Sequence, residues 1–137
     1  MKYLKVITLF FVMVITNCSA QKFNKIIYKV HTRGTAIEIR VKENTIRYQK
    51  NGKELEFKLS EEEVGRLEEL IKKINLNDIE GLKSPTNRRY SDGALIASFV
   101  IEAEEKKYTS STFDAGNPPM ELKKLEGLLY SFIKINE

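Results

Sequence analysis

Apolar and polar residues alternate with a period of two through most of the stretch between positions 26 and 59. The alternating segments are 26–30, 37–42, 46–49 and 54–59, and this pattern predicts four half-buried strands. Turn-forming pairs separate the segments. The firmest turn is Asn51-Gly52, because a two-residue hairpin loop needs positive φ at both positions. We therefore expect consecutive antiparallel strands that form a meander.

The period changes directly after the fourth predicted strand. Ser60 and Glu63 form a capping box, a reciprocal pair of hydrogen bonds that begins many helices. An apolar stripe at helical spacing follows, made of Val64, Leu67, Leu70, Ile71 and Ile74. We predict a helix that ends at Asn75, followed over 76–82 by a short 3₁₀ or irregular turn with apolar residues under the sheet.

The second half of the chain predicts two further strands and a second helix. The strand at 94–101 is apolar on both faces, so we expect an interior strand that is covered on each side. The strand at 106–112 alternates again, and Asn117 is the expected N-cap of the last helix, with Pro118 and Pro119 in its first turn. The residues expected on its buried face are Leu122, Leu125, Leu128, Leu129, Phe132 and Ile133.

These elements predict an α+β fold. The expected architecture is an antiparallel sheet of about six strands, in the order ββββ-α-ββ-α, with two helices packed on it.

The first 20 residues have the three parts of a secretory signal. Lys2 and Lys5 supply positive charge, positions 6–16 are an apolar run, and small residues close the segment at 18–20. The apolar run is shorter than the ~20 residues that a membrane-spanning helix needs. We therefore predict a signal peptide at 1–20, a short tether at 21–25 and a single domain at 26–137.

Two cleavage sites are open. Cleavage before Gln21 leaves a domain without cysteine, soluble in the periplasm or secreted. The segment Ile15-Thr16-Asn17-Cys18 instead resembles a bacterial lipobox, in which the cysteine is acylated and becomes the N-terminus, although Asn17 departs from the usual small residue. Cys18 is the only cysteine, and an unpaired thiol is a liability in an oxidising compartment, which favours acylation. We expect an exported lipoprotein, tethered to a membrane and facing the periplasm or the outside.

Composition argues against several classes of function. Without Lys2 and Lys5 the chain keeps 21 basic and 19 acidic residues, interspersed as on a solvated surface rather than gathered into a nucleic-acid-binding stripe. His31 is the only histidine and is out of phase with the apolar face of its strand, so we expect neither a catalytic triad nor a histidine zinc site. We predict no catalytic residue, metal, cofactor or nucleic-acid partner, and a monomeric chain.

One group of polar and aromatic residues is predicted to converge. If the strands at 94–101 and 106–112 pair as a hairpin, the loops at 84–93 and 113–119 meet at one edge of the sheet. The residues brought together are Asn87, Arg88, Arg89, Tyr90, Asp92, Phe113, Asp114 and Asn117. Arginine and aromatic residues are enriched at protein interfaces, so a protein-binding edge is the first functional interpretation.

Three other interpretations of these loops are open. Asp92 and Asp114 could act as a glycosidase-like carboxylate pair. An arginine fork beside a helix N-terminus could hold an anion. The same residues could also serve only the loops themselves, through turn hydrogen bonds and arginine–acid pairs.

The order of the elements resembles a known family. A sheet precedes a helix that opens with Ser60-Glu61-Glu62-Glu63, and a polar loop and a hairpin precede a last helix that opens with Pro118-Pro119-Met120-Glu121-Leu122. From about Tyr28 to Ile133 this layout is similar to emfourin-type inhibitors of thermolysin-like metalloproteases. It is equally similar to small exported bacterial lipoprotein domains without an assigned activity. The resemblance implies a non-enzymatic domain, with protease inhibition as one purpose.

The leading expectation is an exported, lipid-anchored, non-enzymatic domain that binds a protein partner in the bacterial cell envelope. The alternatives are an inhibitor of a thermolysin-like protease, a small carboxylate-dependent hydrolase, and a structural lipoprotein whose sheet edge docks into an envelope assembly.

Overall fold

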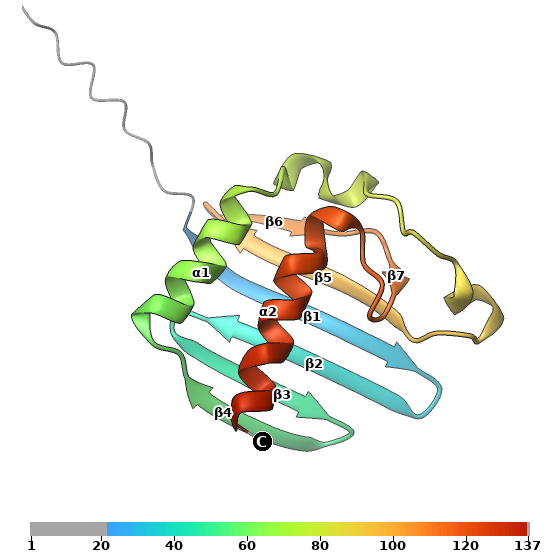
Figure 1. The fold of residues 1–137 in the computed structure, drawn as a ribbon, viewed down its shortest axis with the longest axis horizontal. Helices are drawn as coiled ribbons and strands as arrows, with labels where there is room; N and C mark the ends of the chain where they lie inside the picture. Colours follow the sequence, from blue (N-terminus) through green and yellow to red (C-terminus); the bar gives the residue numbers. More distant parts are fainter. Residues whose placement is uncertain (1–21, 137) are drawn as a thin grey trace, which may run out of the picture.

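A seven-stranded antiparallel sheet forms the centre of the structure, a computed structural model that describes residues 22–136 (Figure 1). The strands are β1 (Phe23–Thr32), β2 (Thr35–Lys42), β3 (Thr45–Lys50), β4 (Lys53–Lys58), β5 (Ile96–Ala103), β6 (Lys106–Thr109) and β7 (Phe113–Asp114). Their order across the sheet is β4-β3-β2-β1-β5, and both β6 and the two-residue β7 pair with the outer edge of β5. The predicted α+β class and the meander of the first four strands are confirmed.

The domain begins earlier than predicted. The signal peptide, both cleavage sites and Cys18 lie outside the described residues. β1 starts at Phe23, whose side chain is 7% exposed and belongs to the apolar core, so the expected tether at 21–25 is wrong from this residue onward. The period-two pattern did not reveal Phe23 because the pairing with β5 is irregular between Phe23 and Lys25.

Tight turns join the strands of each hairpin. Asn51 and Gly52 both have positive φ, 48° and 85°, as the Asn-Gly pair predicts. The turn between β5 and β6 has the same signs of φ with Glu104 at 50° and Glu105 at 63°. Positive φ is unfavourable for residues other than glycine, asparagine and aspartate, so this second turn is conformationally strained.

The first helix, α1 (Glu61–Lys72), begins with the predicted capping box. Ser60 Oγ accepts a hydrogen bond from the Glu63 amide at 3.2 Å, and the Glu63 carboxylate accepts one from the Ser60 amide at 2.7 Å. The helix ends before the predicted Asn75. Asn75 instead caps a 3₁₀ helix, η1 (Leu76–Gly81), which confirms the short turn expected in this region.

The second helix, α2 (Met120–Asn136), begins later than predicted. Asn117 is not its N-cap, because its backbone forms a bridge with Asp114 and its amide donates to the Asp114 carbonyl at 2.9 Å. Pro118 and Pro119 are buried and precede the helix rather than lying in its first turn. Within residues 22–136, no helix has the length and apolar character needed to cross a membrane.

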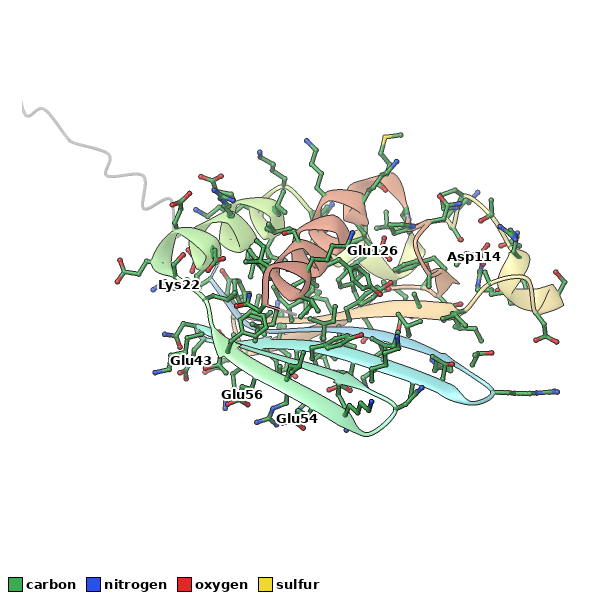
Figure 2. All side chains as sticks on the ribbon, turned by 60° about the horizontal axis from the view of Figure 1, so that its bottom comes forward. Lys22, Glu43, Glu54, Glu56, Asp114 and Glu126 are labelled. Carbon is green, nitrogen blue, oxygen red and sulfur yellow. The ribbon has the colours of Figure 1, made fainter. Side chains whose placement is uncertain are left out.

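Both helices cover the same face of the sheet (Figures 1 and 2). The fully buried large side chains of the core include Ile26, Tyr28, Ile39, Ile46, Leu67, Ile71, Phe99, Ile101, Phe113, Leu122 and Leu125. The strand predicted at 94–101 lies at 96–103. Its expected covering on each side is wrong, because among residues 22–136 both helices pack on one face and none on the other. Val100 on that face is nevertheless only 8% exposed, since it lies opposite Ile27 and Thr109 on the neighbouring strands.

Candidate functional site

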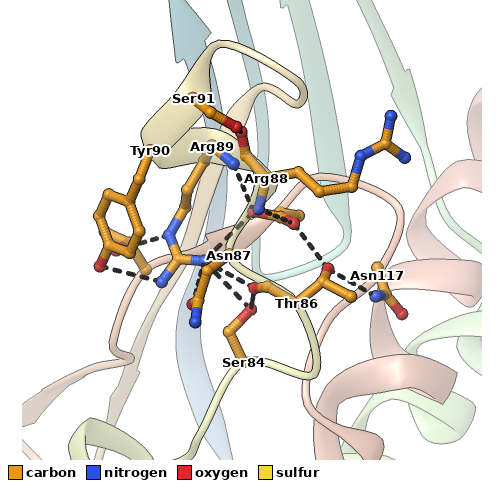
Figure 3. Close-up of polar contacts among 10 residues, drawn as sticks. Ser84, Thr86, Asn87, Arg88, Arg89, Tyr90, Ser91 and Asn117 are labelled. Carbon is orange, nitrogen blue, oxygen red and sulfur yellow. Dashed lines mark hydrogen bonds and ion pairs between the residues drawn. The ribbon is translucent and has the colours of Figure 1, made fainter.

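The loops at 84–93 and 113–119 meet at the outer edge of β5, with Thr86 close to Asn117 (Figure 3). The carboxylate of Asp114 joins the two loops. Asp114 Oδ2 accepts hydrogen bonds from Thr86 Oγ1 at 2.6 Å and from the Arg88 amide at 2.8 Å. Oδ1 accepts from the Arg89 amide at 3.0 Å and from Arg89 Nη1 at 3.2 Å. Asn117 Nδ2 extends the network by donating to Thr86 Oγ1 at 2.9 Å. One buried carboxylate therefore organises two loops.

The sheet register explains why Asp114 occupies this place. β7 pairs with β5 so that Asp114 lies opposite Ile96, beside a second 3₁₀ helix, η2 (Arg88–Ser91). Amides at the start of a helical turn have no carbonyl acceptor within the turn. Asp114 accepts hydrogen bonds from two of these amides in η2. The carboxylate thus replaces the missing backbone partners of the turn.

Arg89 supplies the second buried charge and is 8% exposed. Besides its bond to Asp114, its Nη1 donates to Thr86 O at 2.9 Å, Asn87 Oδ1 at 3.2 Å and Ser84 Oγ at 3.3 Å. A buried ion pair needs such additional hydrogen bonds to offset the desolvation of both charges. Because the Arg89 guanidinium is bonded to Asp114 and to its own loop, Arg88 and Arg89 do not form the paired anion-binding fork that was one open interpretation.

The donors around Asp114 determine its protonation state. Burial by itself raises a carboxyl pKa, but the hydrogen bonds from Thr86, from the two η2 amides and from the Arg89 side chain outweigh it. They hold the pKa of Asp114 well below its usual range, so the group is ionised at neutral pH. The Asp114 side chain is 3% exposed and accepts these bonds, so it lies in no open cleft, and the structure does not support a glycosidase-like pair with Asp92.

Two side chains of η2, those of Arg88 and Tyr90, lie on the exposed side of this network. The Arg88 side chain points away from the Arg89 guanidinium (Figure 3), and Tyr90 is 75% exposed. The Tyr90 ring is held in place by Arg89, whose guanidinium carbon lies 4.3 Å from the ring centroid and whose Nη2 donates to Tyr90 Oη at 3.1 Å. A shallow hollow of about 330 Å³ beside the ring is lined in part by Ser84 and Thr112.

The structure does not place all predicted residues on this surface. Asn87, Arg88, Arg89, Tyr90, Asp114 and Asn117 meet in the network or on its exposed side. Phe113 does not, because it is fully buried and stacks on Phe99 with ring centroids 6.0 Å apart. Asp92 is exposed at the end of η2, where it adopts a φ of 55°.

Several members of the network were not among the predicted residues. Thr86 bonds to a carboxylate 28 positions later, and Ser84 to an arginine of the same loop. Ser111 Oγ donates to the Leu82 carbonyl and links the end of η1 to the segment before β7. Hydroxyl side chains in polar loops follow no periodic pattern, so no sequence signal distinguishes these from ordinary loop residues.

A second buried carboxylate supports the loop at 113–119. Glu126 on α2 is 6% exposed, and its Oε1 accepts hydrogen bonds from Tyr28 Oη and from the Gly116 amide, the latter at 3.1 Å. Burial, together with the hydrogen bond to Glu126, raises the pKa of Tyr28 and keeps the phenol protonated as a donor. Helical spacing could have revealed Glu126, since it falls on the buried stripe of α2.

Among the described residues, no group of three or more His, Cys, Asp or Glu side chains is close enough to hold one metal ion. His31 is exposed on β1, as predicted. Comparison with known proteins finds no matching family model, no matching curated protein and no matching solved structure. The resemblance to emfourin-type inhibitors stays a prediction.

Proposed function

We propose that this protein is an exported, membrane-tethered, non-enzymatic domain that binds a protein partner of the bacterial cell envelope. The binding site is the η2 surface, defined here as Asn87, Arg88 and Tyr90. The observation that carries the proposal is the contrast between Arg89, buried and bonded on all sides, and Tyr90, which is 75% exposed at the next position.

Contacts within the protein support the backbone of the η2 surface and the Tyr90 ring. Asp114 bonds the amides of Arg88 and Arg89, and the Arg89 guanidinium supports the Tyr90 ring. A surface that is already ordered avoids much of the entropy loss that accompanies binding. This arrangement favours recognition of a folded partner.

The side chains of the η2 surface also indicate the chemistry of that partner. Arginine and tyrosine are the residue types that most often carry binding energy at protein interfaces. A partner that fits this surface has a carboxylate opposite Arg88. It also has an apolar pocket for the Tyr90 ring, with a polar group near the hydroxyl. The secretory signal and the lipobox-like segment before Cys18 support the export and the tether.

Site-specific photo-crosslinking in cells tests the binding site. A benzophenone amino acid replaces Tyr90 in the full chain, and a matched control carries it at Ile135, which is 76% exposed at the end of α2. We expect position 90 to form a discrete adduct with one envelope protein, absent from position 135 and severalfold weaker in an Arg88→Ala background. No adduct at position 90, or the same adducts from both positions, contradicts the proposed site.

The intact mass of the mature chain from the membrane fraction tests the tether separately. A diacylated or triacylated chain that starts at Cys18 supports it. A lipid-free chain that starts at Gln21 removes the tether and leaves the binding site to be judged by the crosslinks.

A further inference from the structure

We infer that the fold holds the η2 surface at the membrane-distal end of the protein, so that its partner approaches from the side away from the anchoring bilayer. This inference rests on the proposed lipid anchor at Cys18 and deepens the proposed function. It limits the partner to a soluble protein, or to a domain that projects from the bilayer.

The sheet register determines which end of the molecule carries the η2 surface. At one end of β1, Phe23 pairs with Ala103. At the other end, His31 pairs with Ile96, which pairs in turn with Asp114. The stretch from Phe23 to His31 spans about 26 Å at the usual rise of a strand. Figure 2 shows the same separation, with Lys22 at one end of the molecule and Asp114 at the other.

The chain enters the fold at the end opposite the η2 surface. β1 starts at Phe23, so only positions 19–22 separate the strand from an acylated Cys18. A fully extended chain covers at most about 3.6 Å per residue, which keeps Phe23 within roughly 18 Å of the lipid-bearing residue. The entry end of β1 is therefore held beside the headgroups, whatever path the link takes.

Both broad faces carry charges of both signs, and ion pairs neutralise part of the basic charge on the open face of the sheet, which also carries Lys29, Lys42 and Lys58. On the open face of the sheet, Lys25 pairs with Glu102 at 2.9 Å, and Arg47 pairs with Glu56 at 2.7 Å. These pairs reduce the attraction of that face for an anionic bilayer. On the helix side, α1 opens with three exposed or half-exposed glutamates at 61–63, which such a bilayer repels.

The geometry limits what the η2 surface can reach. With the entry end at the headgroups and β1 upright, the length of β1 places Tyr90 beyond the headgroup layer. A helix embedded in the same bilayer is out of reach, while a folded domain in the surrounding compartment can dock on Arg88 and Tyr90. The partner is therefore a folded protein surface with an acidic group, presented outside the bilayer.

Energy transfer from single labelled sites to the bilayer tests the orientation. The full lipidated chain is reconstituted in vesicles that carry an acceptor dye on their headgroups. An acylated Cys18 has no free thiol, so one introduced cysteine takes one donor dye. Asn44→Cys, in the β2–β3 turn, marks the entry end, and Ser91→Cys marks η2; Arg33→Cys, in the β1–β2 turn, is a distal control outside the loop network.

We expect donor quenching at position 44 to be severalfold stronger than at positions 91 and 33, with the fold of each labelled chain checked by circular dichroism. Equal quenching at 44 and 91, or stronger quenching at 91, overturns the orientation while leaving the lipid and the binding site in place. An intact mass without lipid would instead contradict the membrane tether of the proposed function. The mass measurement therefore distinguishes a wrong orientation from a missing anchor.

Discussion

Arg89 Nη1 lies 3.2 Å from Asp114 Oδ1, and the two side chains, 5% and 3% exposed, form the most deeply buried ion pair among the described residues. Every other ion pair described has side chains at least 27% exposed. Arg88, the preceding residue in sequence, is exposed. Two adjacent arginines therefore have different roles, one within the fold and one on its surface.

The first prediction separates these roles by alanine substitution. Arg89→Ala leaves the Asp114 carboxylate buried without its cation, and we expect the Tm to fall by roughly 10–20 °C. Arg88→Ala removes an exposed side chain and should move the Tm by less than about 3 °C. Thermal unfolding followed by circular dichroism measures both. Equal losses in the two variants would contradict the assignment of Arg89 to the fold.

The second prediction concerns acid stability. The pKa of Asp114 is lower in the folded state than in the unfolded chain. Its stabilising contribution is therefore present above the unfolded carboxyl pKa of about 3.9 and is lost as the pH falls through the folded value. We expect Asp114→Asn to be less stable than the parent at pH 7 and to lose less stability between pH 5 and pH 3.

Thr86→Val provides the graded control for this prediction. It removes one hydrogen-bond donor to Asp114 and keeps the carboxyl. Without this donor the folded-state pKa of Asp114 lies closer to the unfolded value. The acid loss of the variant should therefore begin at the same pH as in the parent chain and be smaller, between the losses of the parent and of Asp114→Asn. Tm values measured across the pH series decide the point, and an Asp114→Asn profile parallel to the parent would speak against it.

The third prediction concerns alkaline stability. Burial and the hydrogen bond to Glu126 raise the pKa of Tyr28 in the folded state. The contribution of Tyr28 is therefore complete below the unfolded tyrosine pKa of about 10 and is lost as the pH rises towards the folded value. Tyr28→Phe should flatten the decline in Tm above pH 10. It should also lower the Tm at pH 7, because Glu126 loses a donor.

A double variant separates the two effects in this prediction. In Tyr28→Phe with Glu126→Gln, the buried carboxylate is neutralised, and part of the Tm lost at pH 7 should return. The alkaline decline should stay flat, since the phenol is still absent. A double variant with the alkaline decline of the parent would refute the role of Tyr28.

The fourth prediction concerns the strained turn between β5 and β6. Replacing Glu104 and Glu105 by Asn and Gly supplies residues suited to their φ angles of 50° and 63°. We expect the change to add about 0.5–2 kcal/mol to the free energy of unfolding. Denaturant unfolding measures it, and Gly52→Ala, at a φ of 85°, is the control expected to act in the opposite direction. A destabilised Asn-Gly variant would show that the strain has been misassigned.

Local patterns predicted most of the fold. The alternation from Ile26 predicted the strands, Asn51-Gly52 predicted a hairpin turn, and Ser60 with Glu63 predicted the start of α1. The covering of the two faces of β5 was not predictable. A strand that is apolar on both faces has the same sequence pattern whether a second layer of structure or the side chains of neighbouring strands cover its second face. The early start of β1 at Phe23 was hidden by a register irregularity.

The candidate site was predictable in position and not in detail. Hairpin pairing brought the two loops together, but nothing in the sequence distinguishes Arg88 from Arg89. Successive side chains in a 3₁₀ turn point about 120° apart, so one of two identical neighbours turns inward. Phe113 was expected at the surface and lies in the core because β7 alternates, which directs Phe113 inward and Asp114 to the edge.

The Asp114 carboxylate binds η2 largely through the main-chain amides of Arg88 and Arg89. Amides are present in every residue type except proline, so positions 88 and 90 can accept other side chains without loss of the Asp114 contacts to η2 backbone. The backbone of η2 is therefore positioned independently of the side chains at these two positions. For the proposed binding role, this means that a change at those two positions would alter the partner surface while Asp114, Arg89 and Thr86 stay as they are.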